Sequence, residues 1–365
     1  MLALLDSTYA GWDARPMIHV SAALLHRQIV AVFTCWGMAA DAAAAAADVM
    51  VETDLSGVDS HGIGMLPHYQ RLFAEGRLDP KAAPVVLRDN PCMVLVDARH
   101  GLGHVAALKA MELAIEKARQ SGLGLAGVTG SNHYGAAGYY ARMAAGHGLL
   151  AISLTNAPSP LLVPVFGREA ALGTNPIAFA APTAAAERPV LLDMATTTVA
   201  YGKVSIARRA GKRLPEGWAL DAEGRPETDA AVAAEARRLA PLGGSREQGG
   251  HKGYGLALMV EILCATLTGA QASAQETGHF FLVIDPGFFR STDAFQGDMA
   301  ALLARLRGIT PVDLAQPVLI PGDPEHAALE RRRAAGIPLV PTLVEEVRAV
   351  CAQCGAPFLL GDGSA

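Results

Sequence analysis

The sequence predicts an α/β protein in which an α/β middle is inserted between two helical ends. Its 365 residues are 51% apolar and 18% charged, a composition that can bury a sizeable core. Short apolar runs alternate with helical segments through the middle of the chain. Both ends have a helical pattern, so we expect the two termini to form one domain around the inserted middle.

A length of 365 residues favours two domains, or one domain carrying a large insertion, at roughly 150 residues per domain. We expect a frayed extension over 1–16, a discontinuous helical domain over 17–90 and 300–365, and an α/β domain over 91–299. The first residues lack the basic region of a signal peptide and reach Asp6 too early for one. Met17 opens a cleaner beginning.

Three helices are expected near the N-terminus, over 21–36, 40–55 and 67–76. Ser21 can cap the first helix, and Gly37 ends it. The second is built on an alanine run, and alanine loses little entropy in a helix. Pro67 suits the first position of the third. The turn-rich segment SGVDSHG, residues 56–62, separates the second helix from the third.

The middle of the chain contains short apolar runs of strand type, such as MVLVD over 93–97. We expect strands over 93–97, 123–130, 149–156, 177–180, 189–193 and 279–285. Helices are expected over 104–120, 134–146 and 252–268, and residues 211–250 are expected to form loops. The last 70 or so residues have a helical pattern again.

Composition excludes several classes of protein. The net charge is −5 with no strongly basic region, so we expect no nucleic-acid partner. No stretch of about 20 strongly apolar residues is present, so we expect no membrane association. Five scattered cysteines indicate a reducing, cytoplasmic location. The pair Cys351 and Cys354 lacks a second CxxC, and the histidines lack grouped spacing, so no metal site is expected.

A Rossmann fingerprint is matched only in part. Residues 101–106 fit G-x-G-x-x-A and open a helix, but three residues separate them from the strand before. The next strand end, 128–130, offers no acidic residue for a ribose. We therefore interpret Gly101 and Gly103 as allowing a tight helix start.

Two histidines are candidates for catalysis. His61 lies in DSHG at a break between helices, where an imidazole can transfer protons near neutral pH and Ser60 can orient it. The alternative is that His61 is an ordinary turn residue and that Asp59 caps the next helix. His133 lies in GSNHYG, after a strand and before a helix, where ligands bind in open α/β sheets. Packing on the sheet is its alternative role.

Two further segments carry polar groups. Asp193 ends a strand and precedes three threonines, so it can hold an imidazole in one tautomer or cap the following helix. In GGHKGYG, residues 249–255, glycines permit close backbone approach, and Lys252 supplies a charge for a diphosphate or carboxylate. The alternative there is a flexible loop with a solvated lysine.

Seven blocks in this order resemble the type-2 malate/L-lactate dehydrogenase family of NAD(P)-dependent oxidoreductases. They are DSHGIGMLPHYQRL, GSNHYGAAGYYARMA, LGTNPIAFAAP, LLDMATTTVAYGK, LPEGWALDAEGRPETD, GGHKGYGLALMVEIL and GHFFLVIDP. The family also includes ureidoglycolate dehydrogenase, sulfolactate dehydrogenase, diketogulonate reductase and the piperideine- and pyrroline-2-carboxylate reductases. The resemblance implies a non-Rossmann dinucleotide-binding α/β domain inserted into a helical domain, and a homodimer with the cofactor near the subunit interface.

The resemblance also implies roles for individual residues. His61 is expected to exchange the proton with the substrate, with Ser60 and Asp193 orienting it, and His133 competes for that role. The expected cofactor contacts are Asp193, Met194, Ala195, His251, Lys252, Gly322 and Asp323. Asn156, Thr174 and Asn175 are expected to line the substrate pocket.

Two departures from the family concern the substrate. Several relatives have an arginine four residues after the motif histidine, where this chain has Met65. A substrate carboxylate must then be held elsewhere, by Lys252, by Arg71 or by the helix N-terminus expected at Tyr134. The segment between Gly269 and Gly278 is also short for the family.

These observations predict a dehydrogenase that transfers hydride between NAD(P) and a small 2-hydroxy acid of malate or lactate type. A cyclic imino acid reductase and a ureidoglycolate-type dehydrogenase are the alternatives within the family. A non-catalytic dinucleotide-binding protein is the alternative of another class. NAD is favoured over NADP because the sequence shows no obvious basic pair.

Overall fold

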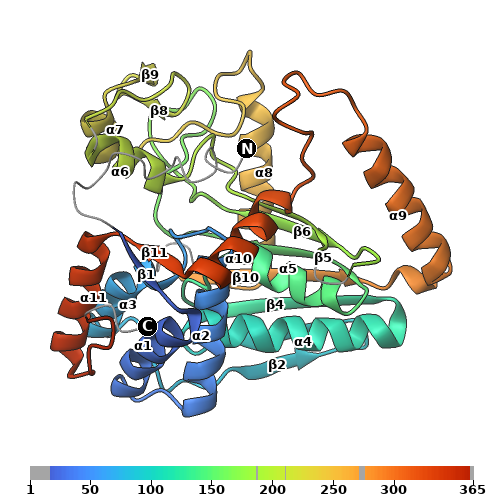
Figure 1. Ribbon diagram of the computed structural model, residues 1–365, viewed down its shortest axis with the longest axis horizontal. Coiled ribbons are helices and arrows are strands. Elements are labelled where there is room, and N and C mark those ends of the chain that lie inside the picture. The colour runs from blue at the N-terminus through green and yellow to red at the C-terminus, as the bar shows by residue number, and fades with distance from the viewer. Residues whose placement is uncertain (1–16, 186–187, 210, 271–275, 362–365) are drawn as a thin grey trace.

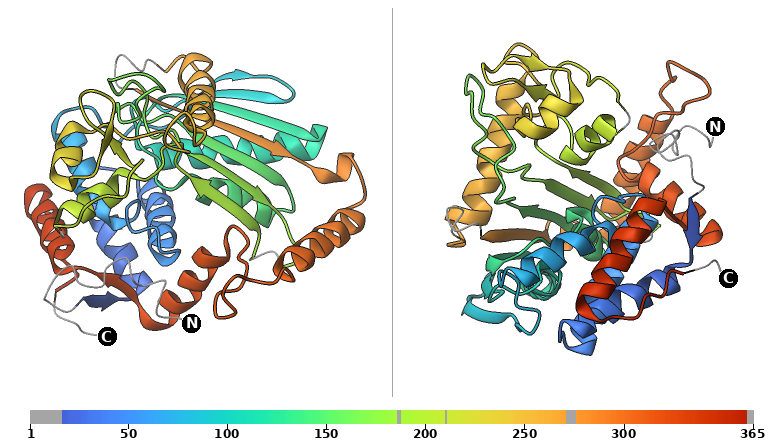
Figure 2. Two further views of the ribbon diagram at one scale, coloured as in Figure 1. Left: turned by 90° about the horizontal axis from the view of Figure 1, so that it is seen from above. Right: turned by 90° about the vertical axis from the view of Figure 1, so that its left-hand side faces the viewer.

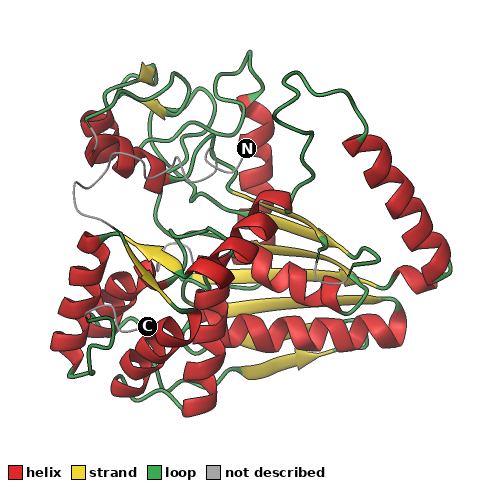
Figure 3. Ribbon diagram, viewed as in Figure 1, coloured by secondary structure: helices red, strands yellow, loops and turns green. Residues whose placement is uncertain are grey.

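The computed structural model describes residues 17–185, 188–209, 211–270 and 276–361 (Figures 1 and 3). Its helices are α1 Ala22–Cys35, α2 Ala40–Leu55, α3 Leu66–Ala74, α4 Gly103–Ser121, α5 Ala137–Gly146, α6 Tyr201–Arg209, α7 Ala230–Ala236, α8 Gly250–Glu261, α9 Thr292–Arg307, α10 Asp323–Ala335 and α11 Pro341–Cys354. Short 3₁₀ turns are η1 Ile63–Met65 and η4 Pro286–Phe288, and η2 Ile262–Thr266 is a π-helix.

The strands are β1 Ile18–Val20, β2 Val85–Asp89, β3 Met93–Asp97, β4 Leu123–Ser131, β5 Leu150–Thr155, β6 Ile177–Ala181, β7 Val190–Met194, β8 Ala219–Leu220, β9 Pro226–Glu227, β10 Thr277–Ile284 and β11 Ile337–Leu339. Seven of them form one sheet in the order β2-β3-β4-β10-β5-β6-β7. Only β3 and β4 pair in parallel within it. The α/β prediction is confirmed, and the sheet is mixed rather than doubly wound.

Both faces of the sheet are covered by helices, as Figure 2 shows from two further directions. α4 and α5 pack on one face, where Phe281 and Val283 of β10 are fully buried. Phe280 points the other way and packs with Cys264 of η2 and Val260 of α8. Because strand side chains alternate between faces, one strand at the centre of the sheet contributes to both cores.

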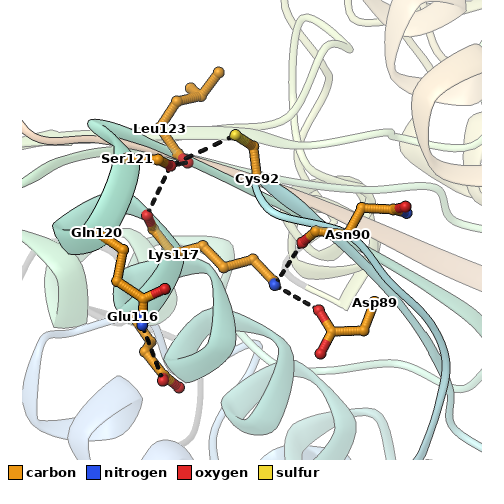
Figure 4. A network of polar contacts seen from close by, with 8 residues as sticks. All are labelled: Asp89, Asn90, Cys92, Glu116, Lys117, Gln120, Ser121 and Leu123. Carbon is orange, nitrogen blue, oxygen red and sulfur yellow. Dashed lines mark hydrogen bonds and ion pairs between the residues drawn. The ribbon is translucent and has the colours of Figure 1, made fainter.

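The C-terminal end of α4 is fastened to the turn between β2 and β3 (Figure 4). Lys117 donates through Nζ to the carboxylate of Asp89 and to the carbonyl oxygen of Asn90. Ser121 donates to the carbonyl oxygens of Lys117 and Leu123. These contacts fix α4 against the sheet edge, and its other end lies beside the backbone that follows β4 and carries His133.

Gly103 shows why the partial Rossmann fingerprint has its glycines. A Cβ added there would lie 2.1 Å from the carbonyl oxygen of Asn132 and 2.7 Å from that of His133. The first turn of α4 therefore packs directly on the backbone that follows β4. The glycine serves this close approach to a neighbouring segment, whereas the expectation concerned a tight start of the helix itself.

The two ends of the chain meet. β1 pairs antiparallel with β11, and one apolar core combines α1, α2 and α3 with α10, α11 and the segment to Leu360. α9 crosses the boundary expected at residue 300 and lies at the right of Figure 1, away from that core. The expected division into two domains stays a prediction.

Several elements differ from their expected form. The helix expected from Tyr134 begins at Ala137, because Tyr134 stacks on His279 and Gly135 has φ +80°. Strands β1, β2 and β11 were not expected, and they are short or exposed. Residues 211–250 contain β8, β9 and α7 rather than loops alone. The expected frayed extension, 1–16, lies outside the described residues.

No helix in the described ranges has the length and apolar character needed to cross a membrane.

Candidate active site

A cavity of about 510 Å³ lies between the helices of the chain ends and the edge of the sheet at β7. It brings together eight of the residues singled out in the sequence. These are Ser60, His61, Met65, His133, Thr174, Asp193, Met194 and Ala195. They come from four separate segments, and the volume is in the range of small-molecule sites.

The segment that carries His61 is held on both sides. On one side Arg332 of α10 forms an ion pair with Asp59 and donates to the carbonyl oxygen of Asp54, 2.6 Å away. On the other, Oδ2 of the buried Asp54 accepts from the N–H of Ile63 at 2.8 Å. A Cβ at Gly62 would lie 1.9 Å from Oδ1 of Asp54, so only glycine fits there.

The imidazole of His61 lies at the cavity wall. Oγ of Ser60 is 2.7 Å from Nδ1 of His61, which agrees with the expected orienting role of the hydroxyl. Burial lowers the pKa of His61 from 6.5 to about 4. At neutral pH the ring is therefore uncharged and has one nitrogen available to accept a proton.

His133 lies beside His61, with ring centroids 5.3 Å apart. Its Nδ1 is 2.8 Å from the hydroxyl of Tyr69 and accepts from the N–H of Gly135 at 3.3 Å. A backbone N–H can only donate, so Nδ1 of His133 is unprotonated and Nε2 carries the hydrogen. Burial and the neighbouring histidines hold the pKa of His133 well below 6.5, so its Nε2–H is a neutral donor.

Asp193 ends β7 in the cavity wall. Its Oδ2 accepts from the N–H of Gly138 in the first turn of α5, at 2.7 Å. Among the described residues, this is the only hydrogen bond that the Asp193 carboxylate forms. No hydrogen bond joins Asp193 to His61. Burial raises the pKa of Asp193 to about 6, the Gly138 N–H opposes this, and Glu325 adds to it.

Three charged residues in the cavity wall were not foreseen from the sequence. Glu52 on α2 forms an ion pair with Arg142 on α5, and Glu325 comes from the first turn of α10. Burial, followed by the charge of Arg333, lowers the pKa of Arg142 to about 10. Their sequence context is ordinary helix surface, so only the fold brings them to the cavity.

Asn156 and Asn175 lie outside the cavity lining and are buried. Asn156 accepts from the N–H of Gly278 at 2.7 Å. Asn175 accepts from the N–H of Ala157 and donates to Glu261 at 2.8 Å. These amides hold the strands and loops behind the cavity wall.

The remaining expected contacts also lie outside this cavity. His251 and Lys252 are exposed on α8, where Nδ1 of His251 is 2.8 Å from Arg246. Gly322 and Asp323 begin α10, and Asp323 pairs with Arg307 at 2.8 Å. Gly322 lines a small hollow of about 30 Å³ that adjoins the cavity through Arg142, Leu191 and Glu325.

Two of the groups expected to hold a substrate carboxylate have other contacts. Arg71 lies 2.8 Å from Nδ1 of His68. The N-terminus of α5 is at Ala137 and not at Tyr134, and its Gly138 N–H is bonded to Asp193. No group of three or more potential metal ligands occurs among the described residues.

Comparison with known proteins identifies the family. A family model described as malate/L-lactate dehydrogenase matches residues 20–348. The malate dehydrogenase of Pyrococcus horikoshii is 40% identical over 91% of this chain and 94% of its own length. The L-sulfolactate dehydrogenase of Methanothermobacter thermautotrophicus is 38% identical over 84% of this chain and 89% of its own length.

Solved structures agree with this assignment. The malate dehydrogenase of Entamoeba histolytica superposes with a TM-score of 0.89 at 30% identity, covering 93% of this chain and 99% of that one. The delta1-piperideine-2-carboxylate reductase of Pseudomonas syringae gives 0.81 at 32% identity, covering 91% and 99%. The chain belongs to the malate/L-lactate dehydrogenase family and is an oxidoreductase with a nicotinamide cofactor.

Proposed function

We propose that this dehydrogenase interconverts a small 2-hydroxy acid of malate or lactate type with its 2-oxo acid. The observation that carries the proposal is the pair His61 and His133, whose rings lie 5.3 Å apart in a cavity of about 510 Å³. Relatives named malate and sulfolactate dehydrogenase support the substrate class.

The chemistry divides between the cofactor and the side chains. When bound, the nicotinamide accepts or supplies the hydride. In the oxidation direction, uncharged His61 takes the hydroxyl proton while Ser60 holds its Nδ1. His133 donates its Nε2–H to an oxygen of the substrate, which does not require an arginine at the position of Met65. A positioned imidazole typically contributes about 10²–10⁴-fold in rate.

The cavity fits a nicotinamide ring on the side of β7. Asp193, Met194 and Ala195 line that wall, and the carboxylate of Asp193 is anchored by Gly138 at 2.7 Å. Asp193 therefore contacts the cofactor on this side of the cavity. The residue that orients His61 is Ser60. Thr174 completes the wall.

The other expected cofactor contacts remain part of the proposal. His251, Lys252, Gly322 and Asp323 are assigned to the dinucleotide by resemblance, and Gly322 lines the hollow that adjoins the cavity. A cytoplasmic homodimer with the cofactor near the subunit interface is proposed on the same ground. The sequence favours NAD because it shows no obvious basic pair.

A cyclic imino acid reductase is the second candidate. The specific observation that favours it is the 0.81 TM-score with a piperideine-2-carboxylate reductase. The same two histidines would then serve a C=N bond in place of a C=O bond. A ureidoglycolate-type dehydrogenase and a non-catalytic dinucleotide-binding protein remain as further alternatives.

Oxidation of NADH and NADPH, followed by absorbance at 340 nm, tests the proposal. The substrates are oxaloacetate, pyruvate, 2-oxoglutarate, sulfopyruvate, diketogulonate and the two cyclic imines, with ureidoglycolate oxidation measured in reverse. Turnover of a 2-oxo acid is the expected result. Turnover of an imine alone identifies the reductase, and cofactor binding without any turnover identifies the non-catalytic alternative.

A further inference from the structure

A second cavity of about 440 Å³ adjoins the first. The two share Glu52, Tyr139 and Arg142 in their walls. The second cavity continues between α5 and α10, away from His61 and Asp193. A ligand whose reacting end occupies the first cavity can therefore extend into the second.

The wall of the second cavity is rich in arginine. Arg142, Arg188 and Arg333 line it together with His326, and its carboxylates are Glu52 and Glu330. Arg142 pairs with Glu52, while Glu330 Oε1 lies 2.7 Å from Arg188 and 3.1 Å from His326. Three guanidinium groups thus face two carboxylates, which leaves one positive charge in excess when His326 is neutral.

Like charges are crowded at this site. The charge of Arg333 acts with burial to lower the pKa of Arg142 to about 10. Arg188 and Arg333 are both exposed to solvent. Gathering cations in a concave wall raises the electrostatic potential there and attracts an anion. A bound phosphate would relieve the repulsion that the free protein carries.

The backbone around Arg188 is held in place. Thr183 donates through Oγ1 to the carbonyl oxygen of Arg188 at 3.0 Å, and the N–H of Arg188 donates to Ala185 at 2.9 Å. Leu191 lies two residues after Pro189. Its N–H donates to the carbonyl oxygen of Pro321 at 2.9 Å, and this hydrogen bond joins the segment to the start of α10. Arg188 therefore lies on a segment that is hydrogen-bonded to the start of α10, the helix that carries Arg333.

We propose that Arg188 and Arg333 bind the 2′-phosphate of NADP(H), so that this dehydrogenase prefers NADPH to NADH. This assignment rests on the proposed function, which places the nicotinamide beside Asp193. Guanidinium groups bind phosphate oxygens through paired N–H donors, which neutral ribose hydroxyls match poorly. The two arginines are 145 residues apart, the difference of 333 and 188, so the sequence did not show them as a pair.

Glu330 is the group that argues in the opposite direction, because a carboxylate can accept a hydrogen bond from the free 2′-hydroxyl of NAD. Its side chain is exposed and already contacts both Arg188 and His326. Exposed ion pairs are weak, so a dianionic phosphate can replace Glu330 at Arg188. The net positive charge of the cavity wall therefore favours the 2′-phosphate of NADP(H) over the free 2′-hydroxyl of NAD.

Direct binding measurements test this assignment without relying on turnover. The dissociation constants of NADPH, NADH and 2′-AMP are measured by cofactor fluorescence and calorimetry at two salt concentrations. We expect NADPH to bind more tightly by at least about tenfold, and the preference to shrink at higher salt. The Arg188→Gln/Arg333→Gln variant should lose that preference and 2′-AMP binding, with NADH affinity within about twofold of the parent.

Arg290→Gln is the matched control, since it removes an exposed ion-paired arginine near the remote α9. It should leave all three constants unchanged, and circular dichroism verifies that each variant is folded. Equal or tighter binding of NADH by the parent overturns the assignment, as does equal loss of both dinucleotides in the double variant. Failure of the parent to bind either dinucleotide overturns the proposed function itself.

Discussion

Arg332 forms an ion pair with Asp59, which lies two residues before His61. Arg332 and Asp59 are 273 residues apart in the chain. Arg332 is 8% exposed, and its guanidinium also donates to the carbonyl oxygen of Asp54 at 2.6 Å. One end of α10 therefore fixes the His61 segment. Its other end, where Pro321 accepts from Leu191, contacts the strand that carries Asp193.

The first prediction concerns this contact. Arg332→Gln removes the ion pair between Arg332 and Asp59 and loosens the His61 segment, so kcat should fall by about tenfold or more while the Kd for NADH is retained. Unfolding should also become easier by about 1.5–3 kcal/mol, the usual contribution of a hydrogen bond to a charged group. Stopped-flow kinetics, fluorescence titration and urea denaturation measure the three quantities.

Arg348→Gln provides the control for that experiment, since Arg348 stacks on Phe358 and pairs with the exposed Glu345 on α11. It should leave kcat unchanged. A kcat for Arg332→Gln equal to that of the parent at the same folded fraction would show that the contact serves folding alone.

The second prediction concerns the tautomer of His133. Tyr69→Phe removes the hydroxyl 2.8 Å from Nδ1 and leaves only the longer 3.3 Å contact with the Gly135 N–H to hold the tautomer, so the hydrogen should redistribute between the two ring nitrogens. Nitrogen-15 NMR of the imidazoles should show a single Nε2–H form in the parent and a mixture in the variant. Tyr140→Phe, which removes another buried hydroxyl bonded to Tyr134, should leave the His133 signals unchanged. A Nδ1–H signal in the parent would contradict the assignment.

The third prediction follows from the raised pKa of Asp193, about 6. The folded protein takes up this proton more readily than the unfolded chain, so the group opposes folding increasingly as pH rises from 3.8 through about 6. Asp193→Asn should therefore have a Tm at pH 7 equal to or above that of the parent, while its activity falls. Calorimetry from pH 5 to 8 checks the result, and a lower Tm of the variant throughout would contradict it.

The fourth prediction concerns the pH dependence of the reaction. Because burial lowers the pKa of His61 to about 4, the ring should stay uncharged and able to accept a proton well below pH 6.5. In the Asp193→Asn variant, which lacks the carboxyl that titrates at about pH 6, the residual rate of hydroxy-acid oxidation should therefore hold through pH 6 and fall only toward pH 4. A fall centred near pH 6.5 in that variant would contradict the assignment, because it would indicate a solvated imidazole.

The sequence predicted those parts of the site that local patterns encode. Turn-forming residues around His61, the strand end at Asp193 and the strand–helix junction at His133 each stand out within a few residues. All three meet in one cavity. The α/β class followed from strand-like runs such as 93–97, which the structure has as β3.

Other features depend on contacts between distant segments. Arg142, Arg333 and Glu325 occupy ordinary helix positions, and only the fold, which places α5 and α10 on opposite sides of the second cavity, brings them to a cavity wall. The late start of α5 depends on the stacking of Tyr134 on His279, a residue 145 positions further along the chain. β2 is exposed along its whole length, so it lacks the alternating apolar pattern that identifies a strand.

Comparing His61→Ala with His133→Ala tests the central claim most directly. We expect His61→Ala to lower kcat by about 10²–10⁴-fold and to leave the Kd for NADH nearly unchanged. His133→Ala should chiefly raise the KM for the 2-oxo acid, because it removes a neutral donor to the substrate. The assignment is contradicted if His133→Ala abolishes turnover while His61→Ala retains most of it.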